Sequence, residues 1–115
     1  MLTPWGMSQS KHKLTTGVYS VTTASHGGLL VGKRVARERL SIEAIKEGEP
    51  FAQYLAYEED CAYAAVYADW PDLYRREVET GLLIPPSELG LEPTDDAIRA
   101  YYLLICIRWL DGYKL

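Results

Sequence analysis

The sequence predicts an α+β fold, in which a β-hairpin or small antiparallel sheet packs against about three helices and the last helix is long. Three observations support this prediction. A β-branched run followed by a Gly-Gly pair is typical of a hairpin, short segments with acidic starts are typical of helices, and an apolar stripe at helical spacing ends the chain. The length of 115 residues fits one domain, so we predict a single domain over residues 1–115.

The start of the chain is predicted to be an N-terminal arm over residues 1–16. It combines Pro4, Trp5 and Gly6 with a polar stretch rich in Ser, Lys and His. Such a composition favours a loop over a regular element, because few apolar side chains are available to pack. We expect the tryptophan to anchor this arm to the rest of the domain.

The hairpin is predicted over residues 17–34. Its first strand is the segment 18–23, which is rich in β-branched and aromatic residues. Gly27 and Gly28 are expected to supply the positive backbone angles of a tight reversal. The basic segment 33–39 is expected to end the second strand.

Residues 41–81 are predicted to be mainly helical. Ser41 can cap a short helix that ends at Gly48. A second helix is expected over about residues 58–69, because small residues of high helix propensity follow an acidic triplet placed in its first turn. A third short helix is expected to follow and to end before residue 81. The acidic triplet consists of Glu58, Glu59 and Asp60.

The C-terminal helix is predicted over residues 94–111. Thr94 is the expected cap, and apolar residues from Ile98 to Trp109 recur at steps of three and four residues. The segment is apolar on more than one side. It is therefore expected either to lie at the centre of the core or to form half of a partner interface, which includes a possible homodimer through this helix.

The formal net charge of −4 conceals an uneven distribution. Residues 1–40 carry six basic residues and one acidic residue, whereas residues 41–115 carry six basic and fifteen acidic residues. An acidic balance opposes direct binding to nucleic acid, because that affinity comes mostly from Lys and Arg at phosphates. The charges are typical of a solvated surface. They also suit a partner with a basic surface, either a host protein or a nucleoprotein complex.

No catalytic residue is assigned, because the sequence contains no Walker loop, no GxGxxG after a strand, no GxSxG and no HExxH. The alternative is a Cys/His-dependent hydrolase or transferase, in which His26 or His12 activates the Cys61 thiol. The acidic neighbours of Cys61 oppose activation, since they raise the pKa of a thiol. A buried structural cysteine and a histidine that fixes its turn are the simpler interpretations. The histidines and cysteines lack metal-site spacing, so no metal or cofactor is expected.

Three motifs together resemble an uncharacterised family of small domains found in proteins of phages and plasmids. They are TPWG at residues 3–6, the segment 17–28 that ends in SHGG, and YEEDCAYA at residues 57–64. The resemblance covers about residues 3–71 and implies no activity. It implies a context, since small proteins of mobile elements are often counter-defence factors such as anti-CRISPR proteins. The motif positions are Trp5, Gly6, Ser25, His26, Gly27, Gly28, Glu58, Glu59 and Asp60.

We therefore expect a small mobile-element protein that binds and inhibits a host defence complex, for example an anti-CRISPR protein, through an acidic surface. No apolar run is long enough to cross a membrane and the start lacks the pattern of a secretory signal, so the host cytoplasm is the expected location. A structural subdomain of larger mobile-element proteins is a further alternative. The residues expected to contact the partner are Glu43, Glu47, Glu49, Tyr67, Asp69, Trp70 and Asp72.

Overall fold

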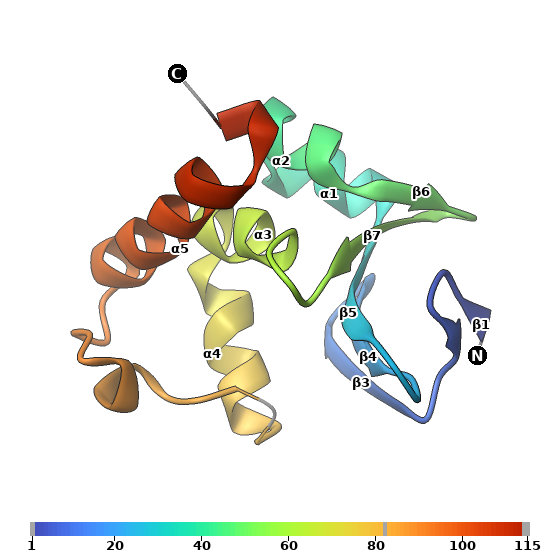
Figure 1. Cartoon of the computed structure of the whole chain (residues 1–115), viewed down its shortest axis with the longest axis horizontal. Coiled ribbons are helices and arrows are strands. Elements are labelled where there is room, and N and C mark those ends of the chain that lie inside the picture. Colours follow the sequence, from blue (N-terminus) through green and yellow to red (C-terminus); the bar gives the residue numbers. More distant parts are fainter. Residues whose placement is uncertain (1, 82, 114–115) are drawn as a thin grey trace.

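A five-stranded antiparallel sheet with helices on one face forms the centre of the computed structural model, which describes residues 2–81 and 83–113 (Figure 1). The α+β prediction is therefore confirmed. All neighbouring strands of the sheet are antiparallel. In spatial order the strands are β3 (Ser10–Thr15), β4 (Val18–Thr22), β5 (Gly27–Gly32), β7 (Tyr54–Glu58) and β6 (Glu49–Phe51).

The helices cover one face of this sheet, and the central one is α3, which contacts both α4 and α5. The short helices α1 and α2 lie beside each other near the end of the sheet where β6 and β7 are found (Figure 1). No helix in the described part of the chain has the length and apolar character needed to cross a bilayer. The helices are α1 (Lys33–Arg39), α2 (Ile42–Glu47), α3 (Tyr63–Asp69), α4 (Pro71–Glu79) and α5 (Asp95–Trp109), with 3-10 turns η1 (Pro86–Leu89) and η2 (Asp111–Tyr113).

The N-terminal segment forms strands and is not the predicted arm. β1 (Leu2–Thr3) pairs with β2 (Gly6–Met7) in a separate two-stranded sheet, and β3 is an edge strand of the main sheet. Strand β3 is not recognisable from its sequence, because it is mostly polar and Leu14 is its buried apolar residue. This composition is typical of an edge strand, where exposed lysines protect the open edge. The expected anchoring role of Trp5 is found: the ring packs on the sheet face opposite the helices, against Val21, Leu30 and Ala56.

The predicted hairpin is present as β4 and β5, but its turn differs from the prediction. The reversal is made by residues 23–26, where the Thr23 hydroxyl donates to the His26 carbonyl oxygen and accepts from the His26 amide. Gly27 and Gly28 belong to β5 and pair with β4. A Cβ at Gly28 would lie 2.2 Å from the Tyr57 carbonyl oxygen and 2.8 Å from the Trp5 ring. The glycine is therefore needed for close packing, not for the turn.

The predicted helix over 58–69 begins only at Tyr63, because strand β7 runs to Glu58 and a turn over residues 59–62 follows it. The region 41–81 is thus not entirely helical, and the acidic triplet lies at the end of a strand and in the turn after it instead of starting a helix. β7 lies between β5 and β6, with Leu55 and Tyr57 facing the helices and Ala56 facing Trp5. A strand buried on both faces lacks the polar–apolar alternation by which strands are usually found. The basic segment 33–39 ends the second strand as predicted, and it does so by forming helix α1.

The remaining helix predictions are confirmed closely. The Ser41 hydroxyl accepts from the Ala44 amide at the start of α2, and the Thr94 hydroxyl accepts from the Ala97 amide at the start of α5. In α5 the residues Ile98, Tyr102 and Cys106 are buried. Each cap satisfies a backbone donor that the first helical turn leaves without a partner.

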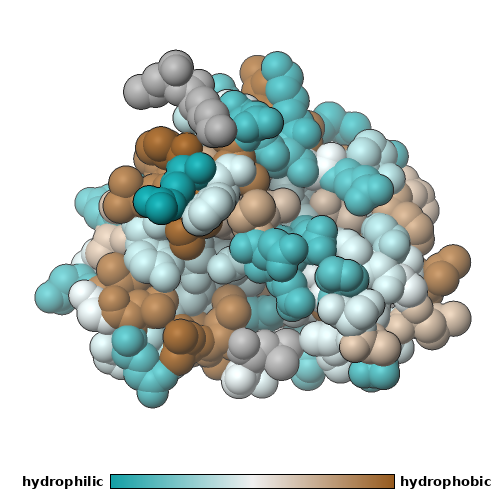
Figure 2. Space-filling model, viewed as in Figure 1, coloured by the Kyte–Doolittle hydropathy of each residue, from teal (hydrophilic) through white to brown (hydrophobic). Residues whose placement is uncertain are grey.

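The opposite side of α5 is apolar and exposed (Figure 2). Trp109, expected on the buried stripe, is 62% exposed, because the helix ends there and Leu110 takes the buried place. The predicted homodimer through this helix stays a prediction. The exposed apolar residues of α5 are Leu103, Leu104, Ile107 and Trp109.

Candidate functional site

A cavity of about 240 Å³ lies between the β4–β5 hairpin and the helices α3 and α4. It combines two carboxyl groups, two tyrosines and a serine hydroxyl with apolar walls. We call it the Glu77 pocket, after its buried carboxyl group. Its lining residues are Ser20, Val21, Thr22, Gly28, Leu29, Glu59, Tyr63, Tyr67, Glu77 and Leu83.

Glu77 is a buried carboxyl group, and one of its two oxygens is unpaired among the described residues. The residue is only 6% exposed. Ser20 Oγ donates to Glu77 Oε1 at 2.5 Å, whereas Glu77 Oε2 has no hydrogen-bond partner among the described residues. An unpaired buried acceptor lowers the stability of the folded protein. A bound donor that pairs with it would recover this free energy.

The pocket raises the pKa of the Glu77 carboxyl. Burial is the largest cause, because it disfavours the charged form. The hydrogen bond from Ser20 and the charge of His12 act in the opposite direction and only reduce the effect. Perturbed carboxyl groups in cavities are more frequent at functional sites than elsewhere.

The helical repeat of α4 places Glu77 in the pocket. Leu73 and Tyr74 are buried on the inner face of α4, and Glu77 follows them by four and three residues. This spacing calls for an apolar side chain at position 77. The glutamate found there is therefore a signal for the site that is present in the sequence. Ser20 belongs to β4 and lies on the same face of the strand as Val18 and Thr22, toward the pocket.

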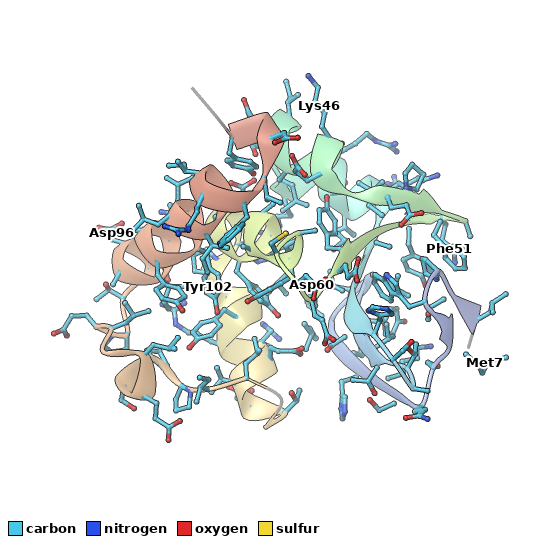
Figure 3. The ribbon with its side chains drawn as sticks, in the orientation of Figure 1. Met7, Lys46, Phe51, Asp60, Asp96 and Tyr102 are labelled. Atoms are coloured by element: carbon cyan, nitrogen blue, oxygen red, sulfur yellow. The ribbon has the colours of Figure 1, made fainter. Side chains whose placement is uncertain are left out.

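The acidic triplet, which we call the acidic rim (Glu58, Glu59 and Asp60), borders this pocket. The Glu59 amide donates to the Gly27 carbonyl oxygen at 3.0 Å, which fixes the rim to the hairpin. Glu59 lines the pocket, and both Glu59 and Asp60 are exposed. Figure 3 places Asp60 near the middle of the face that is shown, and Figure 2 shows hydrophilic residues gathered there.

The geometry gives the proposed Cys61 and His26 pair little support. His26 Nδ1 lies 3.1 Å from Glu58 Oε1, so the imidazole is paired with the acidic rim. Cys61 is half-buried against the core, and its pKa is raised by burial and further by Asp60, Glu47 and Glu58. Within residues 2–81 and 83–113, no three His, Cys, Asp or Glu side chains are grouped to hold a metal.

Tyr67 and Trp70 are the two aromatic residues among the predicted partner contacts. Tyr67 is 1% exposed and packs among other tyrosines, so it is a core residue and not the predicted partner contact. Its place inside follows from the Ala-rich α3, which is buried along most of its length between the sheet and α5. Trp70 is half-buried and holds the Arg39 guanidinium over its ring at 4.9 Å.

The predicted acidic contacts do not form one free surface. Asp69 accepts a hydrogen bond from the Ser41 amide at 2.7 Å, Glu47 accepts one from the Gly112 amide at 3.2 Å, and Asp72 pairs with Arg76. These three carboxylates therefore already have partners within the chain. Glu43 on α2 and Glu49 on β6 remain exposed.

Some of the motif positions have a structural role, and others lie close to the pocket. Gly6 has a φ of +115°, which other residues rarely adopt, at the start of β2 directly after the turn from β1. The Gly27 carbonyl oxygen accepts a hydrogen bond from the Glu59 amide, and the Trp5 ring packs closely on Gly28. Ser25 is exposed in the hairpin turn. The motifs thus hold the rim and the pocket in place.

Glu77→Gln is expected to raise the free energy of unfolding at neutral pH. Because the folded state raises the pKa of Glu77, the stability due to its protonation is present at acid pH and is lost as pH rises through the folded-state pKa. Glutamine keeps an acceptor for Ser20 without a charge, so the gain should vanish toward acid pH. Urea unfolding of both proteins between about pH 4 and 8 tests this, and a difference independent of pH would contradict it.

Comparison with known proteins places the whole site inside one family. No curated protein and no solved structure matches the chain. A family model described as a domain of unknown function (DUF7007) matches residues 1–102, which include every described strand, the acidic rim and all residues that line the Glu77 pocket. The chain therefore belongs to the DUF7007 family.

Proposed function

We propose that this protein is a non-enzymatic binding protein that occupies a basic surface of a partner and thereby inhibits it. The observation that carries the proposal is the acidic rim beside a pocket whose buried carboxyl group lacks a partner. Acidic groups at an opening attract basic groups and raise the rate of encounter. A buried acceptor without a partner then adds a contact that a bound group can satisfy.

A basic surface on a protein is commonly one that binds nucleic acid. A protein that covers such a surface competes with the nucleic acid for the same site. Inhibition then needs no chemical step, which agrees with the raised pKa of Cys61 and the pairing of His26 with Glu58. The Cys/His enzyme and the structural subdomain are the alternatives.

The resemblance to phage and plasmid proteins supports a narrower form of this proposal. In that form, the partner is a host defence complex in the cytoplasm, and the protein is a counter-defence factor such as an anti-CRISPR protein. This part rests on the TPWG, SHGG and YEEDCAYA motifs and not on the geometry of the pocket.

A double variant, Glu59→Gln with Asp60→Asn, tests the proposal. It removes two exposed carboxylates from the acidic rim, and Glu88→Gln with Glu92→Gln removes two other exposed carboxylates, on η1 and in the loop after it, as a matched control. Each tagged protein is incubated with host extract at about 50 and 500 mM salt, and the retained complexes are assayed for nucleic-acid binding.

We expect the wild type and the control to retain a complex with a basic surface at low salt and to displace its nucleic acid. Retention should fall at least about tenfold at high salt and in the rim variant, because both weaken the same charge attraction. Retention that is independent of salt, or equal in the two double variants, would reject the acidic rim as the binding surface. Loss of the effect in Cys61→Ala would favour the enzyme.

A further inference from the structure

We propose that the Glu77 pocket binds the guanidinium group of an arginine side chain that the partner inserts past the acidic rim. This inference rests on the proposed function and names the group that the site recognises. Three features of the pocket lead to it: an unpaired acceptor, a second carboxyl group that lines the same cavity, and aromatic walls.

The unused acceptor selects a hydrogen-bond donor. Glu77 Oε2 lines a cavity, is almost completely buried and accepts no hydrogen bond from the described residues, while Ser20 occupies Oε1. A carboxyl oxygen in this state is best satisfied by an N–H group, and a charged donor gives the stronger bond. The pocket thus suits a donor that the described residues do not supply.

The second carboxyl group selects a cation. Glu59 reaches the same cavity from the acidic rim and is exposed, so it stays available to a ligand that enters from solvent. A cation held between Glu59 and Glu77 is attracted by both and offsets the cost of keeping Glu77 ionised in a buried place. A neutral donor offsets none of that cost.

The aromatic walls favour guanidinium over ammonium. Tyr63 and Tyr67 line the pocket next to the carboxyl groups, with their rings 5.4 Å apart and nearly perpendicular. A guanidinium group is planar, stacks on aromatic rings, is weakly hydrated and donates through several N–H groups at once, whereas an ammonium group is a compact and strongly hydrated charge.

The size of the cavity limits what can enter. A volume of about 240 Å³ lies below the roughly 300–1,000 Å³ of pockets for drug-sized ligands. It suits a single side chain better than a larger molecule. An arginine presented by a protein surface fits this limit and supplies the basic partner surface that the acidic rim attracts.

The test is a titration of the whole chain with n-butylguanidinium, followed by amide shifts in ¹H–¹⁵N spectra. n-Butylammonium and the neutral isostere n-butylurea are the comparison ligands. We expect saturable shifts at Ser20, Gly28, Glu59 and Glu77 with the guanidinium, at least about tenfold weaker binding of the ammonium and none of the urea. Equal shifts with all three, or none with the guanidinium, would overturn the proposal.

Variants on α4 and the rim make the assignment specific. Glu77→Gln should weaken binding of n-butylguanidinium at least about tenfold, because it removes the buried charge and the unused anionic acceptor. Glu79→Gln, an exposed glutamate on the same helix, should change it less than about twofold. Glu59→Gln leaves an exposed rim position neutral and should weaken it about threefold, which keeps the test valid if the Glu77 variant does not fold.

The two proposals fail in different ways. If n-butylguanidinium binds and depends on Glu77, but the rim variant still retains the host complex, the proposed function is wrong and the pocket is a site for a free guanidinium compound. If the host complex depends on the rim while Glu77→Gln binds n-butylguanidinium like the wild type, the pocket proposal is wrong and the proposed function stands.

Discussion

Replacing Tyr102 by alanine is expected to lower the free energy of unfolding by about 3–5 kcal/mol, the range measured when a large buried aromatic side chain is removed. Tyr102 is 3% exposed, and its ring has those of Tyr63, Tyr67 and Tyr74 as neighbours at centroid distances of 6.0, 5.1 and 5.3 Å. The variant therefore leaves a cavity where α3, α4 and α5 meet. It also removes edge-to-face and tilted ring contacts that stabilise beyond simple burial.

Urea unfolding followed by circular dichroism measures this loss. Leu104→Ala is the matched control, because Leu104 lies on the same helix and is 67% exposed. Its effect should stay within about 0.5 kcal/mol, as for most surface positions. Similar losses in the two variants would show that the exposed face of α5 is buried in solution, as the predicted homodimer requires.

Replacing Gly28 by alanine is expected to cost about 3 kcal/mol and to release the N-terminal segment from the sheet. The added Cβ would stand 2.2 Å from the Tyr57 carbonyl oxygen and 2.8 Å from the Trp5 ring. The first contact involves the backbone of the neighbouring strand, so β5 and β7 must separate to relieve it. Trp5 then loses the flat surface on which it packs.

Tryptophan fluorescence and thermal unfolding report the two parts of this effect. Gly32→Ala, at the other end of β5, is the control, because its Cβ would meet the Gly17 carbonyl oxygen only at the ordinary distance of 3.4 Å. It should change stability by less than about 1 kcal/mol. A Gly28 variant as stable as the Gly32 variant would contradict the close packing of Trp5 on β5.

Local signals explain which elements could be predicted from sequence. Thr94 and Ser41 mark helix starts by their side-chain chemistry, and the spacing of apolar residues after Thr94 repeats over several turns. Strands β3 and β7 lack such signals. β3 is an edge strand with a mostly polar sequence, and β7 is buried on both faces, so neither shows the simple alternation of a half-buried strand.

The site was predicted less well than the fold because its geometry depends on long-range contacts. The acidic rim and SHGG segment were singled out by sequence, but only the pairing of β5 with β7 places them beside each other. Glu77 was missed, although its position on the inner stripe of α4 was visible. Tyr67 was misassigned because its aromatic ring suits an interface and a core equally well.

The central claim is that Glu77 holds a buried acceptor ready for a cation, and the ¹³C chemical shift of its carboxyl carbon tests this most directly. Followed against pH without ligand, the shift should give a pKa above the ordinary value of a glutamate. Addition of n-butylguanidinium should lower that pKa, because the bound cation favours the charged form. An ordinary pKa in the free protein, or a pKa that the guanidinium leaves unchanged, would contradict the account.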